Sequence, residues 1–377
     1  MRFFLLFLSY TITVSFLSAE VNLGSAGAVA VGFDSSIRHT SNVFLNSSEE
    51  SDLIYTLLPT VNYRSNQGAV GIDAFMGVAM VRFSDFSSID ANNLKCGFSA
   101  IYPKEKNGEN ISLTFSGSYV ESNEAREALL NIVNIDTLNL SLIGSYYLGD
   151  IISMRSSILF ENHNTDTDAY VDVESIELPI AFYYDYDEAM SFGLGYSFRK
   201  SEISRLIVPA DSEDHAFFIG FEDLISPLIQ YEAKLGYRYR NFKYDNNFDD
   251  GGGIYSKLKL RYNLSEITQL SLLLSSDFRT SAANQSVKTS SARFTLNHRL
   301  DPMLSADIGF MISSDNYEQI LGTRDDDDWG VSFGLNYELS EMNCVLKGAI
   351  SYLKHSSDLD TANYNLIVAN FVCSFLY

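Results

Sequence analysis

Hydrophobic and polar residues alternate along most of this chain, and the end of the chain shows the pattern most clearly. In residues 363–377 the two sets of alternate positions differ in character. One set holds Ile367, Ala369, Phe371, Cys373, Phe375 and Tyr377, and the other holds Leu366, Val368, Asn370, Val372 and Ser374. A period of two is typical of a β-strand whose two faces meet different environments. The pattern therefore predicts a strand over residues 363–377.

The same alternation recurs in about eighteen segments, an even number that lets a closed antiparallel sheet keep both chain ends on one side. We expect strands at residues 28–38, 52–64, 69–83, 93–103, 110–121, 136–148, 151–162, 173–185, 189–199, 214–224, 228–240, 253–263, 267–279, 290–300, 303–313, 327–339, 342–354 and 363–377. The alternation is least clear in 93–103 and 136–148, so about sixteen strands is the alternative.

Tight turns and longer polar stretches separate these segments. The tight turns carry Ser, Asp, Pro or Gly, which supply turn geometry; examples are Tyr262–Thr268, Tyr337–Asn343, His298–Leu304 and Tyr147–Ser153. The longer polar stretches are 39–51, 84–92, 122–135, 163–172, 200–213, 241–252, 280–289, 314–326 and 355–362. Short inner turns and long outer loops are typical of outer-membrane barrels. With the N-terminus in the periplasm, every tight turn is predicted to lie inside and every longer stretch outside.

Parity assigns an outward and an inward face to each segment. The clearest apolar stripes, many with aromatic ends, are Ile176, Leu178, Ile180, Phe182 and Tyr184; Ile229, Tyr231, Leu235, Tyr237 and Tyr239; Leu304, Ala306, Ile308, Phe310 and Ile312; and Trp329, Val331, Phe333, Leu335 and Tyr337. Aromatic girdles at the two interfaces mark the lipid face of a membrane barrel. We therefore predict an all-β protein, a transmembrane antiparallel up-and-down β-barrel.

Composition agrees with a barrel and argues against a helical membrane protein. The mean hydropathy is −0.02 although 46% of the residues are hydrophobic, and Tyr (23) and Phe (26) are abundant. A closed barrel satisfies its backbone in lipid and leaves half of its side chains polar, which gives this balance. A secreted soluble β-protein is the alternative. The net charge of −22 argues against nucleic acid as a partner.

Residues 1–19 are predicted to be a signal peptide, which leaves 20–377 as the barrel. Arg2 precedes an apolar stretch from Phe3 to Phe16, and Ser18 and Ala19 supply small residues for cleavage. The apolar stretch is shorter than the roughly 20 residues that a membrane-spanning helix needs. An N-terminal anchor helix is the alternative.

The inward parity carries charges that cannot face hydrocarbon, since one Arg or Lys at the midplane of a bilayer would cost about 2–4 kcal/mol. The predicted basic wall of the lumen consists of Lys234, Arg238, Arg240, Lys257, Lys259, Arg261, Arg279, Arg293 and Arg299. The predicted acidic lumenal positions are Asp73, Glu161, Glu177, Asp185, Asp307 and Glu338. Two opposed walls would make a transverse field for hydrated solutes. The alternative is that these charges pair and fill the lumen.

Catalytic and cofactor motifs are not found in the sequence, so we expect no enzyme, no cofactor and no metal site. The five histidines are scattered, and no nucleophile elbow, zincin motif or Cys-x-x-Cys occurs. The acidic run Asp325–Asp328 lacks the spacing of a calcium loop and is predicted to be a solvated loop. His39, His163, His215 and His355 are predicted to lie near the outer rim.

The three cysteines are an odd number, so no disulfide framework is expected. Parity places Cys96, Cys344 and Cys373 on the lipid face. The turn near residues 358–359 predicts that Cys344 and Cys373 are directly opposite, about 4.5–5.5 Å apart at Cα. A cross-strand disulfide is then possible, and packing of two free thiols is the favoured alternative.

Two segments resemble known outer-membrane proteins. The aromatic end of the last strand, with Phe371, Phe375 and Tyr377, resembles the terminal strand that the barrel assembly machinery recognises. The stretches Thr40–Leu45 and Ser51–Val61 resemble the opening of the putative beta-barrel porin 2 group. That resemblance implies a barrel in the outer membrane of a Gram-negative bacterium, surrounded by lipid and lipopolysaccharide. It also implies a link to exopolysaccharide secretion and to periplasmic polysaccharide-export proteins.

Three functions therefore stand as hypotheses. The first is an outer-membrane pore associated with exopolysaccharide export. The second is a general diffusion porin with a mild anion preference, which would need a long loop inside the lumen. The third is a surface barrel for adhesion or envelope structure that transports nothing. A conductance measurement separates the first two from the third.

Overall fold

The computed structural model describes residues 21–65, 68–104, 110–126, 131–149, 151–167, 172–187, 190–204, 211–226, 228–243, 251–281, 285–319 and 322–376. The predicted signal peptide and Tyr377 lie outside these residues. The strands are β1 (Val21–Asn22), β2 (Ala28–Thr40), β3 (Asp52–Arg64), β4 (Gly71–Phe83), β5 (Ala91–Tyr102), β6 (Ile111–Arg126), β7 (Asn131–Tyr147), β8 (Ile152–Thr165), β9 (Asp172–Asp187), β10 (Met190–Ser204), β11 (Ser212–Ser226), β12 (Ile229–Phe242), β13 (Gly251–Ser265), β14 (Thr268–Ser281), β15 (Gln285–Arg299), β16 (Leu304–Gln319), β17 (Gly322–Leu339), β18 (Cys344–Ser357) and β19 (Tyr364–Leu376). Four 3-10 turns complete the elements: η1 (Gly24–Ala26), η2 (Ser87–Ile89), η3 (Ser340–Met342) and η4 (Asp360–Ala362).

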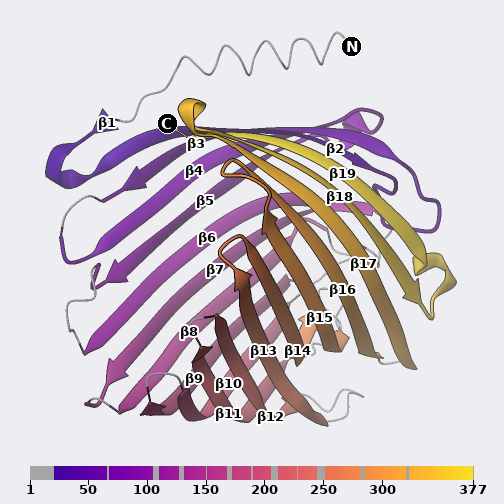
Figure 1. The fold of residues 1–377 in the computed structure, drawn as a ribbon. Helices are drawn as coiled ribbons and strands as arrows, with labels where there is room; N and C mark the ends of the chain where they lie inside the picture. Colours follow the sequence, from indigo (N-terminus) through magenta and orange to yellow (C-terminus); the bar gives the residue numbers. More distant parts are fainter. Residues whose placement is uncertain are drawn as a thin grey trace.

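The strands β2 to β19 form one closed ring. Each pairs antiparallel with the next, and β19 closes the ring by pairing with β2 from Leu376↔Gly32 to Val368↔Thr40. Figure 1 shows this order, from β2 at the top through β9–β12 at the bottom and back to β19 beside β2. The predicted barrel of eighteen strands is confirmed, and the alternative of sixteen is wrong. The short strand β1 adds only two pairs to the start of β2.

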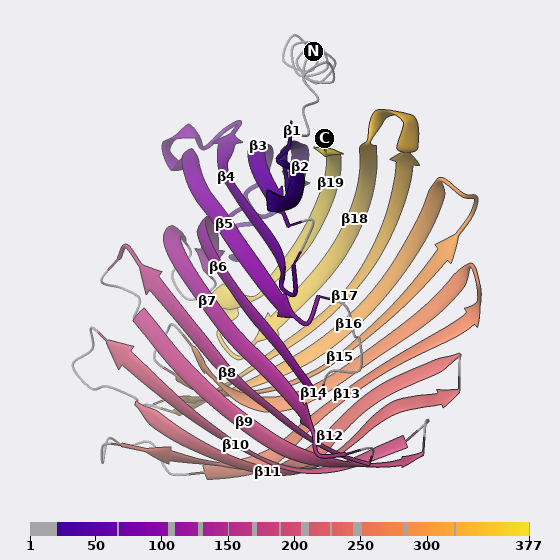
Figure 2. The same cartoon turned by 90° about the vertical axis from the view of Figure 1, so that its left-hand side faces the viewer.

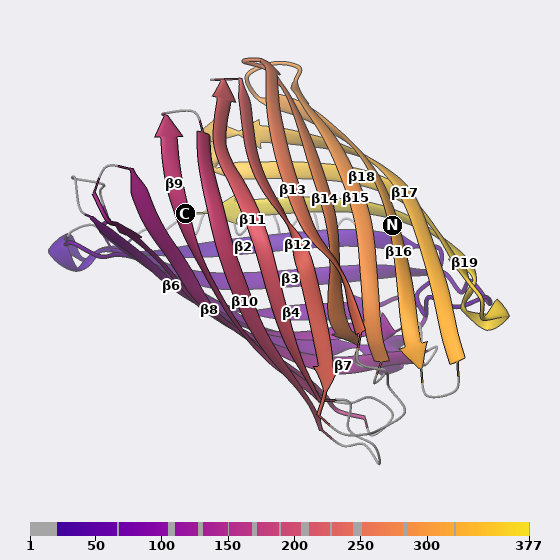
Figure 3. The ribbon, with the colours of Figure 1, turned by 90° about the horizontal axis from the view of Figure 1, so that it is seen from below.

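The strands are long and strongly tilted. A membrane β-strand needs about 9–11 residues to cross the hydrocarbon core, whereas β5 has 12 residues and β17 has 18. The view turned by 90° shows the tilt, with neighbouring strands running obliquely around the barrel (Figure 2). From below, β9–β17 cross in front of β2–β4, which form the far wall (Figure 3). None of the helices in the described part of the chain has the length and apolarity of a membrane-spanning helix.

The barrel has a turn end, where β2 begins and β19 ends, and a loop end, where β2 ends and β3 begins.

At the loop end several of the predicted long loops are shorter than predicted, because the strands continue into them. The stretch 314–326 is the clearest case, since β16 runs to Gln319 and β17 begins at Gly322. Strand positions likewise occupy parts of 122–135 and 280–289.

The predicted lipid face is confirmed. Its large apolar side chains remain exposed around the barrel, for example Phe182 at 50%, Tyr237 at 55% and Ile308 at 50%. Side chains on the opposite parity of the same strands contact other strands across the interior. A continuous exposed apolar surface of this kind fits lipid as its solvent.

The register of the last two strands differs from the prediction. Cys373 is opposite Leu346 and Cys344 is opposite Phe375, so the two cysteines are diagonal neighbours rather than a direct pair. The register differs from the predicted one by two residues, so both cysteine side chains still lie on the same face of the sheet. Their Sγ atoms are 3.7 Å apart, and both are free thiols buried beside Phe33 and Phe375.

Candidate functional site

The candidate site is the inner wall of the barrel, where side chains meet across strands that are not neighbours. Arg238 on β12 is 2.9 Å from Glu177 on β9, and Arg279 on β14 is 2.5 Å from Asp315 on β16. The first contact joins strands three places apart in the ring, which is possible only across its interior. These contacts place the alternate positions of β12–β15, which the sequence predicts as a basic wall, on the lumenal side.

At the loop end the cations of this wall are neutralised around Asp214. The Asp214 side chain is fully buried, with an exposed fraction of 0%. Arg240 donates from Nε and Nη2 to its two oxygens at 2.7 and 2.8 Å, and Arg199 donates from Nε and Nη2 at 2.8 and 2.5 Å. Two guanidinium forks on one carboxylate are the geometry of strong, oriented ion pairs.

Arg238 continues this cluster from the neighbouring inward position. Its Nη2 donates to Glu177 at 2.9 Å, and its Nε is 2.9 Å from a carboxylate oxygen of Asp277. The cluster therefore holds three arginines and three carboxylates on β9, β10, β11, β12 and β14. Charged groups in low-dielectric surroundings are stable only when paired. The equal numbers of arginines and carboxylates therefore explain why six charged side chains can lie together in the barrel interior.

Two predicted members of the basic wall thus present no free charge. Arg238 and Arg240 point inward, but their exposed fractions are 0% and 2%. The predicted acidic residue Glu177 meets Arg238 directly, so the two walls touch at the loop end instead of facing each other across water. At this end of the barrel the lumenal charges pair with one another, which is the alternative to two opposed walls.

Asp214 is absent from the predicted lumenal residues, although it is the first residue of the predicted strand 214–224. The signal that could have found it is parity. Asp214, Ala216, Phe218, Gly220 and Glu222 alternate on β11, and their register partners include the inward-facing Arg199 and Arg238.

Aromatic rings, for which no lumenal position was predicted, lie on the inner wall next to this cluster. Phe218 covers Gly195, where a Cβ would be only 2.2 Å from the ring, and Tyr183 covers Gly193, where it would be 2.6 Å away. Glycine therefore leaves the room in which each ring lies flat. Arg238 stacks 4.8 Å over Tyr255, which packs against Phe218.

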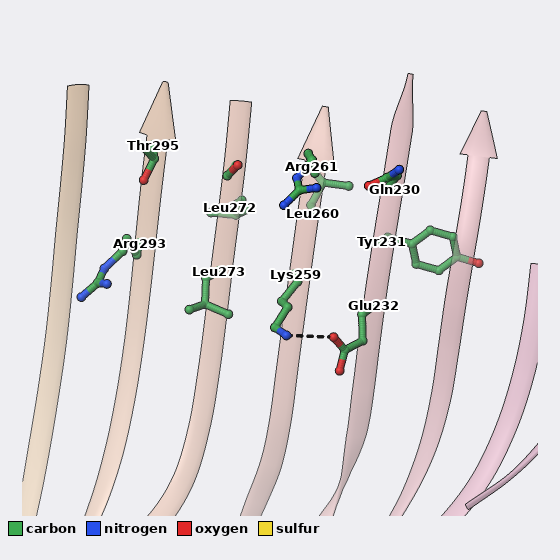
Figure 4. Close-up of a pocket in the computed structure, with 11 residues that line it drawn as sticks. Gln230, Tyr231, Glu232, Lys259, Leu260, Arg261, Leu272, Leu273, Arg293 and Thr295 are labelled. Carbon is green, nitrogen blue, oxygen red and sulfur yellow. Dashed lines mark ion pairs between the residues drawn. The ribbon is translucent and has the colours of Figure 1, made fainter. Parts of the chain in front are cut away.

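In the middle of the wall one carboxylate serves three ammonium groups. Glu232 lies 3.1 Å from Lys259, 3.3 Å from Lys257 and 3.5 Å from Lys234. Figure 4 shows Lys259 directed toward Glu232 from the neighbouring strand. One negative charge against three positive charges leaves this level of the wall cationic.

Toward the turn end the remaining cations are exposed. Arg261, Arg293 and Arg299 are all exposed to solvent, and their ion pairs are not found among the described residues. Arg261 and Arg293 border a hollow of about 440 Å³ between β12 and β15 (Figure 4). The basic wall is thus divided into a compensated loop end and an uncompensated turn end.

The predicted acidic positions are dispersed rather than gathered into one wall. Asp73 pairs with Arg64 at 2.7 Å, and Glu161 with His163 at 2.7 Å. Asp185 accepts from Ser191, Asp307 accepts from Asn336, and Glu338 is exposed.

The acidic run Asp325–Asp328 is part of β17, so the prediction of a solvated loop is wrong. Asp326 is buried and pairs with Arg324 at 2.6 Å, and Asp328 accepts from His355 at 2.8 Å. Alternation explains the run, because every second Asp points inward to these partners. In the described ranges no cluster of His, Cys, Asp and Glu has a metal-binding arrangement.

Comparison with known proteins finds a family model that matches part of the chain and solved structures with a similar fold. Residues 200–371 match the family described as putative beta-barrel porin 2. The first hairpin, which carries the resemblance seen in the sequence, lies outside that match. No curated protein is significantly similar to this chain.

Several solved structures share the architecture at low sequence identity. Pseudomonas aeruginosa OccK2 (OpdF) is 11% identical with a TM-score of 0.53 over 94% of this chain and 98% of its own. Acinetobacter baumannii OccAB4 is 10% identical with a TM-score of 0.51 over 94% and 99%. Pseudomonas aeruginosa OccK3 (OpdO) is 11% identical with a TM-score of 0.50 over 93% and 95%. These likenesses show the fold, a closed β-barrel.

Proposed function

Because residues 200–371 match the putative beta-barrel porin 2 family, we propose that the chain is a water-filled outer-membrane channel that serves polysaccharide export. The observation that carries the channel is the exposure of inward-facing ions. The side chains of Lys259 and Arg279 are 53% and 52% exposed. An interior packed with side chains would bury such groups, whereas a wet lumen hydrates them.

The export role rests on the family resemblance of the first hairpin and is supported by the position of the free cations. They lie toward the turn end, which in outer-membrane barrels is the periplasmic end. A polymer leaving the cell enters there. Periplasmic polysaccharide-export proteins are the partners that this role implies. A general diffusion porin with an anion preference is the second candidate, and the same exposed arginines favour it.

Conductance in a planar bilayer tests the channel. We expect discrete conductance steps from the folded protein. Folding is checked by heat-modifiability, the change in gel mobility in SDS when the barrel is unfolded by boiling. If the folded protein inserts without conducting, it is a surface barrel instead. Deletion of the gene in its native strain tests the export role, because secreted polysaccharide should fall while polysaccharide retained in the periplasm rises. An unchanged distribution would favour the diffusion porin.

A further inference from the structure

Charge compensation changes along the wall formed by β12–β15. At the loop end the arginines of the wall are matched by carboxylates, as described above. Toward the turn end the inward positions of these four strands hold one carboxylate, Glu232, and six cations: Lys234, Lys257, Lys259, Arg261, Arg293 and Arg299. The surplus of positive charge is therefore local.

The register explains why two of these cations are free. Arg261 is opposite Gln230 on β12 and Ser271 on β14. Arg293 is opposite Leu273 on β14 and Met311 on β16. Neither arginine thus has a carboxylate directly opposite. Glu232, the inward position next to Gln230, pairs with lysines instead, and in the described ranges no ion pair of either guanidinium occurs. Both side chains are exposed, so their five-donor forks are available to a solute.

The two arginines border the hollow of about 440 Å³, a volume within the range of small-molecule sites. Its lumenal lining combines four kinds of group. Lys259, Arg261 and Arg293 supply positive charge, Gln230, Ser271 and Thr295 supply hydrogen bonds, and Leu273 supplies an apolar surface. Glu232 supplies one carboxylate, which pairs with Lys259 at 3.1 Å, so the lining keeps a surplus of positive charge. Figure 4 shows Leu273 between Lys259 and Arg293, with Arg261 beyond.

We propose that this hollow binds the carboxylate-bearing sugar of an acidic saccharide as it enters the channel, an inference that rests on the proposed function. A planar guanidinium matches a carboxylate with two parallel hydrogen bonds. The amide and hydroxyl groups match sugar hydroxyls, and Leu273 matches the C–H surface of a sugar ring. A compact inorganic anion would use the cations alone.

The neighbouring inward positions extend this polar surface toward the loop end. Ser275 on β14 follows Leu273 at the next inward position, and Ser291 on β15 precedes Arg293. Their hydroxyl groups are 2.8 Å apart. A saccharide chain longer than one unit would therefore meet further hydroxyl groups along the same strands. Glu232 already occupies the lysines at one edge of the hollow, which leaves Arg261 and Arg293 as the cations with free donors for a carboxylate.

Single-channel recording with tetragalacturonate and maltotetraose tests the subsite, because the two oligosaccharides differ chiefly in their carboxylates. We expect tetragalacturonate to interrupt the current at concentrations roughly tenfold lower than maltotetraose. Arg261→Gln or Arg293→Gln should raise the half-blocking concentration by roughly tenfold. Lys347→Gln is the matched control, since it removes an exposed lumenal cation on β18, away from the hollow. It should change blocking less than about twofold.

Other outcomes would overturn the proposal. If Lys347→Gln weakened blocking as much as Arg293→Gln, the general field of the lumen would be responsible. Equal blocking by acetate and tetragalacturonate would remove the role of the sugar. Calorimetric titration of the detergent-solubilised barrel with tetragalacturonate measures binding without conduction. Binding without conductance would contradict the proposed channel but support the subsite. Conductance without binding would support the channel but contradict the subsite.

Discussion

The environment of each ion, rather than its charge, decides what it contributes inside this barrel. Asp214 is fully buried between two guanidinium groups, whereas Asp73 pairs with Arg64 while both remain more than half exposed. A buried pair strongly penalises loss of one partner because the other charge stays desolvated. An exposed pair is screened by water. Two substitutions of the same type should therefore differ widely in effect.

Asp214→Asn should lower the free energy of unfolding by roughly 3–5 kcal/mol, because Arg199 and Arg240 lose their shared counter-charge. Asp73→Asn should cost about 0–1 kcal/mol. Urea unfolding in lipid vesicles measures both. Similar small values for the two variants would mean that water reaches the cluster around Asp214.

The glycines beneath the lumenal rings make a second prediction at the same scale. A methyl group at Gly195 would collide with Phe218, whereas at Gly348 nothing lies within 4 Å. Gly195→Ala should therefore destabilise the barrel by about 1–3 kcal/mol, and Gly348→Ala should change stability by less than about 1 kcal/mol. Thermal unfolding of the two variants side by side tests the difference. A neutral Gly195→Ala would show that the Phe218 ring moves freely.

At the scale of the strand, periodicity predicted the existence and order of the elements because lipid imposes one strict alternation on every crossing. Beyond the membrane that constraint ends, and prediction failed there. In Asp325–Asp328 all residues are acidic, so no difference between alternate positions marks β17. The pairing of Cys344 also failed, because a shift of two residues leaves every side chain on its own face.

The candidate site was only half predictable for a related reason. Parity shows that Arg238 and Arg261 both point inward. It does not show that Arg238 reaches Glu177, whereas Arg261 meets Gln230 and Ser271. Partners across the lumen come from strands far apart in sequence. The difference between a compensated and a free cation therefore requires the closed ring.

The cationic strand β13 should control ion selectivity. Replacing Lys257, Lys259 and Arg261 with Ser removes three inward charges and leaves Glu232 with Lys234 alone. The permeability ratio of anions to cations should fall by roughly a factor of two or more. The reversal potential in a salt gradient measures it, with heat-modifiability as the check on folding. A conducting variant with unchanged selectivity would show that the path of ions avoids β13.

At the scale of the whole molecule, the ring closes where the first and last strands meet. Phe375 is opposite Phe33 on β2 and is only 6% exposed, so its ring packs within the seam. Tyr377 lies outside the described residues, and its role as an assembly signal stays a prediction. Closure joins segments more than three hundred residues apart, and Phe375 contributes to it.

Replacing Phe375 and Tyr377 with Ser should block assembly rather than transport. We expect the variant to be depleted from the outer membrane and to appear in the periplasm as unfolded protein. Phe333→Ser is the control, because it removes an exposed aromatic ring from the lipid face of β17, away from the seam. Normal amounts of the terminal variant in the outer membrane would contradict the assembly signal.

The unequal compensation of the basic wall has an electrical consequence for the whole barrel. A pore with one wall that attracts anions toward one mouth and is nearly neutral toward the other accumulates salt at the junction under one polarity and loses it under the reverse. The barrel should therefore act as an ionic rectifier. In identical salt on both sides, current should be larger when the voltage drives anions from the turn end toward the loop end. Current–voltage curves of channels inserted in one orientation measure this, and the combined variant Arg261→Gln, Arg293→Gln should make them more nearly symmetric.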